Sequence, residues 1–166
     1  MIERGRGGIR PTRIFAGGGW VQYRRILVPI TGGPGDRRVL DLASILAAKR
    51  NSEVVLVYVV EVKQSLPLDA DMPQEVAHGE ACLAEAERYA RGQAEPKIHR
   101  VFPELLQART AGAAIVDEAI ERNCDVIVMA CKLVDYRGQP TMGETAQYVL
   151  RSASCEVILT REATDL

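Results

Sequence analysis

The sequence predicts one α/β domain built on an open, five-stranded parallel sheet with helices on both faces. Strand and helix signals alternate from residue 23 onward, and right-handed crossovers turn such an alternation into a parallel sheet. The segments 24–30, 52–62 and 124–130 are nearly continuous apolar runs, typical of strands that are buried on both faces. A chain of 166 residues is long enough for one such domain and its core.

The individual elements follow from local pattern. Strands are expected at 24–30, 52–62, 97–102, 124–130 and 155–160. Helices, each with an apolar stripe at helical spacing, are expected at 36–51, 74–93, 110–123 and 143–154. Asp36 and Thr110 are expected to cap the first and third helices, because Asp and Thr favour helix N-termini. The segment 97–102 alternates in polarity and is expected at or near a sheet edge.

The topology also predicts where a ligand binds. In open parallel sheets the cleft lies beyond the carboxyl ends of the strands, where the winding direction reverses. The loops after 24–30 and 124–130 therefore form the expected site. The glycine-rich turn 31–35 follows a strand and precedes a helix, but it lacks the spacing of a dinucleotide or mononucleotide loop. It is either a plain turn or a ligand contact.

Charge divides the chain into two parts. Residues 1–25 hold six arginines and one acid, whereas the remainder is acidic. Residues 1–22, rich in Gly and Arg, are expected to form a disordered extension, and 162–166 a polar tail. A mildly acidic body argues against nucleic-acid binding. No apolar run is long enough to cross a bilayer and no signal peptide is recognisable, so no membrane insertion and a cytoplasmic location are expected.

The cysteines and histidines indicate no metal or catalytic centre. The four cysteines form no C-x-x-C pair, which argues against a zinc site and a disulfide framework. Reduced thiols are typical of the cytosol. His78 and His99 have no neighbouring residues that mark a catalytic triad. Cys131, beside Lys132, either packs or is a reactive thiol.

Four segments resemble the universal stress protein family: "RRILVPITGG", "VVLVYVVE", "CDVIVMACK" and "GETAQYVLRSASCEVILTR". They cover about residues 23–161 in order and at family spacing. The resemblance implies a Rossmann-like fold of the adenine nucleotide alpha hydrolase type, with strand order 3-2-1-4-5. It also implies a homodimer formed by pairing of the last strands, here 155–160.

Members that bind ATP carry the pattern G-x2-G-x9-G-[ST] after the fourth strand and an aspartate after the first strand. The four pattern positions here are Ala130, Leu133, Gly143 and Glu144, so one glycine is kept. Thr31 stands in the place of the aspartate. The resemblance therefore implies a degenerate ATP motif. The candidate ligand-binding residues are Pro29, Thr31, Gly32, Ala130, Lys132, Leu133, Gly143, Glu144 and Thr145.

Glu144 has three interpretations. The segment "TMGE" fits a helix capping box, in which Thr141 caps the helix and Glu144 accepts a hydrogen bond from the Thr141 N–H. First-turn amides that a phosphate would otherwise bind are then satisfied within the chain. Alternatively, Glu144 and Asp135 hold Mg²⁺ while Lys132 and Arg137 meet the phosphates. The third interpretation is a solvated acid. No catalytic residue and no resident metal are assigned, and ATP with Mg²⁺ is a possible ligand.

Three functions remain open. The first is a regulatory binding module of the stress response whose cleft is altered and does not favour ATP. The second is an ATP-binding protein with slow, Mg²⁺-dependent hydrolysis. The third is a protein-interaction module associated with a transporter, as domains similar to this one sometimes are.

Overall fold

The computed structural model describes residues 23–47 and 51–161. The predicted N-terminal extension 1–22 and tail 162–166 lie outside the described residues. Within the described part of the chain, no helix is both long and apolar enough to span a membrane.

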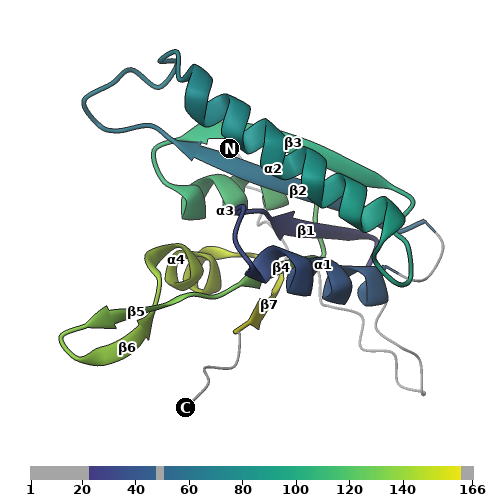
Figure 1. The fold of residues 1–166 in the computed structure, drawn as a ribbon. Helices are drawn as coiled ribbons and strands as arrows, with labels where there is room; N and C mark the ends of the chain where they lie inside the picture. Colours follow the sequence, from purple (N-terminus) through teal and green to yellow (C-terminus); the bar gives the residue numbers. More distant parts are fainter. Residues whose placement is uncertain (1–22, 48–50, 162–166) are drawn as a thin grey trace, which may run out of the picture.

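The five-stranded parallel sheet has the order β3-β2-β1-β4-β7 (Figure 1). Its strands are β1 Arg25–Pro29, β2 Glu53–Glu61, β3 Val101–Ala108, β4 Val126–Ala130 and β7 Glu156–Thr160. The helices are α1 Gly35–Leu46, α2 Pro73–Gly92, α3 Ala111–Glu121 and α4 Glu144–Ser152. Since β7 is the last strand of this sheet, the predicted fold and strand order 3-2-1-4-5 are confirmed.

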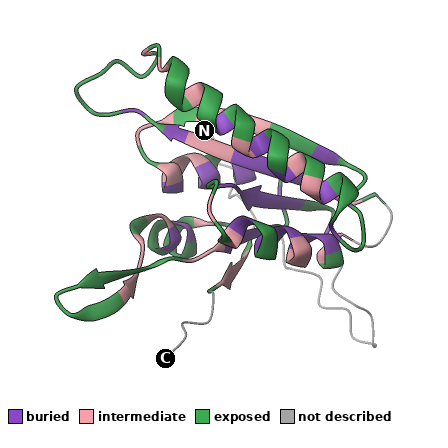
Figure 2. Cartoon of the chain, in the orientation of Figure 1, coloured by how far each residue is buried: buried purple, intermediate pink, exposed green. Residues whose placement is uncertain are grey.

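Successive residues of each central strand pack into two hydrophobic layers, one on each face of the sheet, because side chains alternate across a sheet. Ile26 and Val28 face the layer that α1 and α2 cover, while Leu27 faces the layer under α3 and α4. All three are fully buried. Figure 2 shows the central strands as the buried middle of the molecule and the outer helix faces as exposed. The core is thus aliphatic and two-sided.

Two predicted boundaries are wrong. The third strand was expected at 97–102 but runs from Val101 to Ala108, through Pro103. β3 pairs only with β2 and lies at the sheet edge, where proline's missing N–H removes no ladder bond. The first helix was expected at 36–51 but ends at Leu46, with Ala47 as its C-cap.

A short hairpin between β4 and α4 was not predicted. Strands β5 (Leu133–Tyr136) and β6 (Gln139–Met142) pair antiparallel through a two-residue turn at Arg137 and Gly138. Both turn residues have positive φ, 54° and 78°, as the tight turn of a hairpin requires. The hairpin projects from the body of the domain beside α4 (Figure 1), and β5 is exposed throughout.

Candidate functional site

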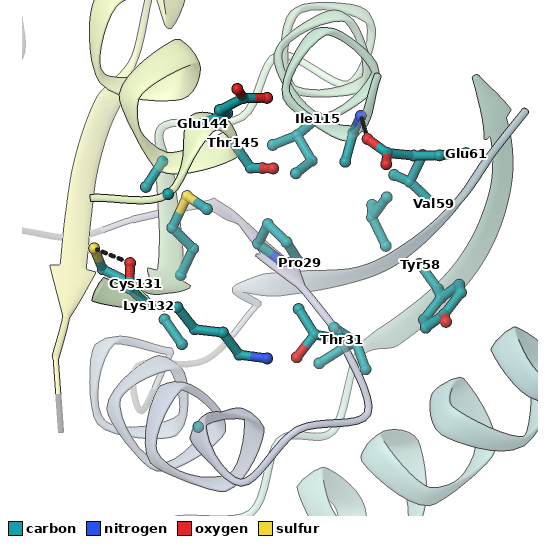
Figure 3. Close-up of a pocket in the computed structure, with 18 of the residues that line it drawn as sticks. Pro29, Thr31, Tyr58, Val59, Glu61, Ile115, Cys131, Lys132, Glu144 and Thr145 are labelled. Carbon is teal, nitrogen blue, oxygen red and sulfur yellow. Dashed lines mark hydrogen bonds between the residues drawn. The ribbon is translucent and has the colours of Figure 1, made fainter. Parts of the chain in front are cut away.

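A cavity of about 950 Å³ opens at the carboxyl ends of β1, β2 and β4, where the topology places the cleft. Eight of the nine candidate residues line it: Pro29, Thr31, Ala130, Lys132, Leu133, Gly143, Glu144 and Thr145. Gly32 does not line it. Figure 3 shows Lys132 extending toward Thr31 along one wall, with Glu144, Thr145 and Glu61 along the opposite wall.

The turn between β1 and α1 is held by a carboxylate of the chain itself. Asp36 accepts hydrogen bonds from the Thr31 N–H (3.1 Å), the Thr31 hydroxyl (3.0 Å) and the Gly32 N–H (2.7 Å). Asp36 is therefore not the expected N-cap, a position that Pro34 occupies. Gly32 has φ +76°, and a Cβ there would lie 2.7 Å from the Cys82 Sγ. The turn amides of Thr31 and Gly32 are consequently not available to an anionic ligand.

A second carboxylate accepts a hydrogen bond from the first amide of α3. Glu61, the last residue of β2, accepts a hydrogen bond from the Ala111 N–H at 2.6 Å. Thr110 is the N-cap residue, as predicted, but its side chain makes no capping bond. Glu61 also lines the cavity. Sequence reasoning missed this residue, although an acid that ends an apolar strand was a visible signal.

Unlike the β1–α1 turn and the N-terminus of α3, the N-terminus of α4 donates no hydrogen bond to a carboxylate of the described residues. Gly143 is its N-cap, and no side chain caps the helix. Thr141 belongs to β6, so the predicted capping box between Thr141 and Glu144 is wrong. The Gly143 N–H donates to the Lys132 carbonyl at 3.0 Å, which places Lys132 beside this helix end. First-turn amides attract anions, so α4 offers an anion-binding position on the cavity wall.

The hairpin holds Asp135 and Arg137, which were expected to bind Mg²⁺ and phosphate, away from the cavity. Asp135 accepts a hydrogen bond from the Gly138 N–H at 2.8 Å, and the Arg137 guanidinium lies over the Tyr136 ring. Neither Asp135 nor Arg137 lines the cavity. No group of three or more His, Cys, Asp or Glu side chains within residues 23–47 and 51–161 is arranged to hold a metal ion.

The charges that line the cavity are balanced. The basic side chains are Arg38, Lys132 and Arg161, and the acidic ones are Glu61, Glu75 and Glu144. The Lys132 Nζ lies 3.8 Å from the position that a Cβ on Gly33 would take, so its side chain reaches from β4 to the β1–α1 turn. The floor of the cavity is aliphatic and includes Val57, Val59, Ile115 and Met129.

The four cysteines lie in different surroundings. All four are free. Burial raises the pKa of the Cys82 and Cys155 thiols, and it raises that of Cys124 to about 12. The Cys131 thiol lies at the cavity and donates toward the Lys132 carbonyl at 3.7 Å. His78, at the far end of the cavity, lies 3.6 Å from the Cys82 Sγ and edge-on to Tyr58. A raised thiol pKa disfavours the thiolate that nucleophilic chemistry needs.

Comparison with known proteins places this geometry in a family. A sequence model of the universal stress protein family matches residues 22–161. A universal stress protein from Archaeoglobus fulgidus has 22% identity and a TM-score of 0.67, covering 82% of this chain and 98% of that one. The A. fulgidus protein in complex with dAMP has 22% identity and a TM-score of 0.63, covering 82% and 97%.

A universal stress protein in complex with cAMP has 20% identity and a TM-score of 0.63, covering 86% of this chain and 99% of that one. Curated protein sequences give no significant match. The family match spans most of the chain and agrees with the sheet order and the position of the cleft. The chain therefore belongs to the universal stress protein family.

Proposed function

We propose that this chain is a cytoplasmic regulatory module of the stress response whose cleft takes a nucleotide with a single phosphate and disfavours ATP. The observation that carries the proposal is the position of Glu144. It is the first residue of α4 and lines the cavity at the helix end where amides are free to meet an anion. A carboxylate a few ångströms from a phosphate opposes binding by about 1–4 kcal/mol, and a triphosphate brings more charge to the same place.

The remaining lining supports a weakly charged ligand. Three basic and three acidic side chains give the wall no net excess of positive charge. Leu133, at the second glycine position of the family pattern, begins β5 and does not adopt a positive φ. The chain after β4 therefore forms a hairpin strand instead of a loop that wraps successive phosphates. One phosphate at the N-terminus of α4, with the Thr145 hydroxyl and Lys132 nearby, is compatible with this arrangement.

The two relatives solved with nucleotides support the same ligand class. One is in complex with dAMP and the other with cAMP, and each of these ligands carries one phosphorus centre. The cavity of about 950 Å³ is large enough for a nucleotide, since small-molecule sites span roughly 300–1,000 Å³.

Calorimetric titration with AMP and with ATP plus Mg²⁺ tests the proposal, after denaturation of the purified protein to check for bound nucleotide. We expect AMP to bind more tightly than ATP. Leu133→Gly combined with Glu144→Ser should raise ATP affinity at least about fivefold, since a like charge is removed. Glu121→Gln, which removes a charge at the far end of α3, is the control and should leave both affinities unchanged.

Two results would overturn the proposal in different directions. If the double variant lowers ATP affinity, Glu144 assists the triphosphate, and slow Mg²⁺-dependent hydrolysis becomes the better account. If neither nucleotide binds, the protein-interaction function remains. The hairpin favours this protein-interaction function, because its apolar side chains are exposed: Leu133 by 41%, Val134 by 47% and Tyr136 by 62%. Pull-down with and without Tyr136→Ser then tests whether the hairpin holds a partner.

We further propose that two copies pair through β7. Among the described residues, neither edge strand of the sheet pairs with a further strand. Edge strand β3 carries Pro103, which blocks edge pairing, whereas β7 (Glu156–Thr160) has no proline and holds three consecutive aliphatic residues. Light scattering checks this proposal. A mass of one chain at micromolar concentration would contradict it.

A further inference from the structure

Residues 63–78, which we call the rim segment, join β2 to the packed part of α2 with little apolar burial. Val62 and Gly79 on either side are buried, but no residue between them is. Leu66 and Leu68 are 41% and 49% exposed. The loop part of the segment reaches past the end of the sheet (Figure 1) and is exposed along most of its length (Figure 2). Because apolar burial supplies most of the stabilisation in a domain, polar contacts must hold this segment in place.

One arginine supplies most of those polar contacts. Arg109 directly follows β3, and its Nη1 group donates hydrogen bonds to three carbonyl oxygens: Val62 (3.4 Å), Lys63 (2.6 Å) and Leu66 (2.8 Å). Among the described residues, one further side chain bonds the loop, where the Gln107 amide donates to the Ala70 carbonyl at 3.1 Å. A charged donor makes stronger hydrogen bonds than a neutral one. Arg109 is therefore the main attachment of the loop.

The rim segment also forms part of the cleft wall. Gln74, Glu75 and His78, in the first turns of α2, line the cavity. The helix packs closely against the sheet from Gly79 onward, where an added Cβ would lie 2.6 Å from the Tyr58 ring. No side chain caps the N-terminus of α2. The first turns thus continue the loop, and the position of the loop determines where their side chains lie in the cleft.

We propose that the rim segment opens and closes as a hinged unit and that Arg109 is the latch that holds it closed. The buried residues Val62 and Gly79 are the two fixed ends. Because the three carbonyl bonds share one nitrogen, loss of the guanidinium breaks them together. Arg109 does not line the cavity, so it acts on the cleft only by positioning the rim segment. The further consequence, that a bound ligand favours the closed state, rests on the proposed nucleotide function.

Brief trypsin digestion of the whole folded protein tests the latch. Lys63 is the only lysine or arginine within the rim segment, so a fragment that begins at Gln64 reports its opening. Mass spectrometry measures how fast this fragment forms. Arg109→Leu should speed cleavage after Lys63 by about tenfold or more, the scale of hydrogen bonds to a charged donor. Arg109→Lys places an ammonium group with three donors near the same carbonyls and should restore most of the protection.

A second arginine provides the matched control. Arg91 donates to the carbonyl oxygens of His99 (2.9 Å) and Val101 (3.1 Å), on the loop that follows α2. Arg91→Leu should speed cleavage after Lys97 and leave cleavage after Lys63 unchanged. Arg109→Gln removes the charge but keeps a polar side chain, so it replaces Arg109→Leu if circular dichroism shows that the leucine variant is unfolded.

The possible results separate the latch from a general stabilising role. Unchanged cleavage after Lys63 in the Arg109 variants would overturn the latch. Equal acceleration after Lys63 and Lys97 in the same variant would also overturn it, because Arg109 would then stabilise the whole domain.

The link to the cleft is measured on the native protein with AMP, at a concentration that calorimetry shows to be saturating. Bound AMP should slow cleavage after Lys63 several-fold. If bound AMP leaves this rate unchanged, the rim segment moves independently of the cleft and the hinge has no part in binding. If calorimetry shows no binding of AMP, the proposed nucleotide function fails, whereas the protease rates of the variants still decide the latch.

Discussion

The close packing of α1 against β4 predicts that a larger residue at Gly35 lowers the stability of the domain. A Cβ added to this first residue of α1 would lie 2.8 Å from the Ala130 Cβ, and among the described residues no other heavy atom outside the adjoining residues and the helix backbone lies within 4 Å. Carbon atoms in optimal contact are about 3.5–4.0 Å apart, so the overlap is roughly 1 Å. Both atoms belong to regular elements, and relief therefore requires a backbone shift. Overpacking of this kind costs about 1–3 kcal/mol, partly offset by the higher helix propensity of alanine.

We expect Gly35→Ala to lower the free energy of unfolding by about 1–2 kcal/mol. Ala130→Gly alone should cost about 0.5–1 kcal/mol, because glycine weakens a strand. The double variant should be no less stable than Ala130→Gly, since the clashing atom is gone. The two effects should therefore be non-additive by at least about 1 kcal/mol.

Urea unfolding of the four proteins, with unchanged m-values, measures this coupling. Gly92→Ala is the matched control: among the described residues, its added methyl would meet no heavy atom within 4 Å beyond the adjoining residues and the helix backbone, so it should be neutral or stabilising. Additive effects, or a Gly35→Ala cost no larger than that of Gly92→Ala, would refute the steric argument.

Three other substitutions have defined outcomes. Burial and the Glu156 hydrogen bond raise the Tyr23 pKa to about 12, so stability that is full below pH 10 should fall by up to about 3 kcal/mol as pH rises toward 12. Tyr23→Phe should remove that part of the decline in urea unfolding, and an unchanged pH slope would contradict it. Asp36→Ala leaves the Thr31 and Gly32 amides without their acceptor and should cost about 2–3 kcal/mol in the same assay; a loss under 0.5 kcal/mol would be inconsistent with the three bonds. Gly138→Val forces a β-branched residue to φ near +78° and should broaden NMR signals of the hairpin while leaving those of β1 unchanged.

The sheet could be predicted because its signals are local. The apolar runs of β1, β2 and β4 have one stable environment, a buried parallel sheet, and the crossover rule orders them. The third strand was misplaced because Pro103 is read as a strand breaker, and only the edge position in the finished sheet makes it tolerable. The hairpin was not predictable from its turn, because Arg137-Gly138 is not one of the dipeptides that favour positive φ at both positions.

The candidate site was less predictable because its hydrogen bonds join distant segments. Topology predicted the position of the cleft after β1 and β4, and the family pattern supplied residues such as Thr31, Ala130 and Glu144 within it. Glu61 and Ala111 are 50 positions apart, so their contact is invisible in local pattern. The capping box predicted at Thr141 does not form, for a related reason. The sequence motif is present, but Thr141 pairs with Val134 and therefore lies in a strand. A local motif forms only when tertiary pairing leaves its residues free.

The carboxylates around the cleft explain together why its ligand should carry little negative charge. Asp36 already occupies the amides of the β1–α1 turn, and Glu61 occupies the first amide of α3. An anionic ligand would have to displace a carboxylate that is covalently part of the chain and therefore always present at high effective concentration. The N-terminus of α4 escapes this competition, because Glu144 lies within its first turn but makes no cap. The proposed single phosphate would therefore lie at α4, whereas the Thr31, Gly32 and Ala111 amides would offer further phosphates no free donor.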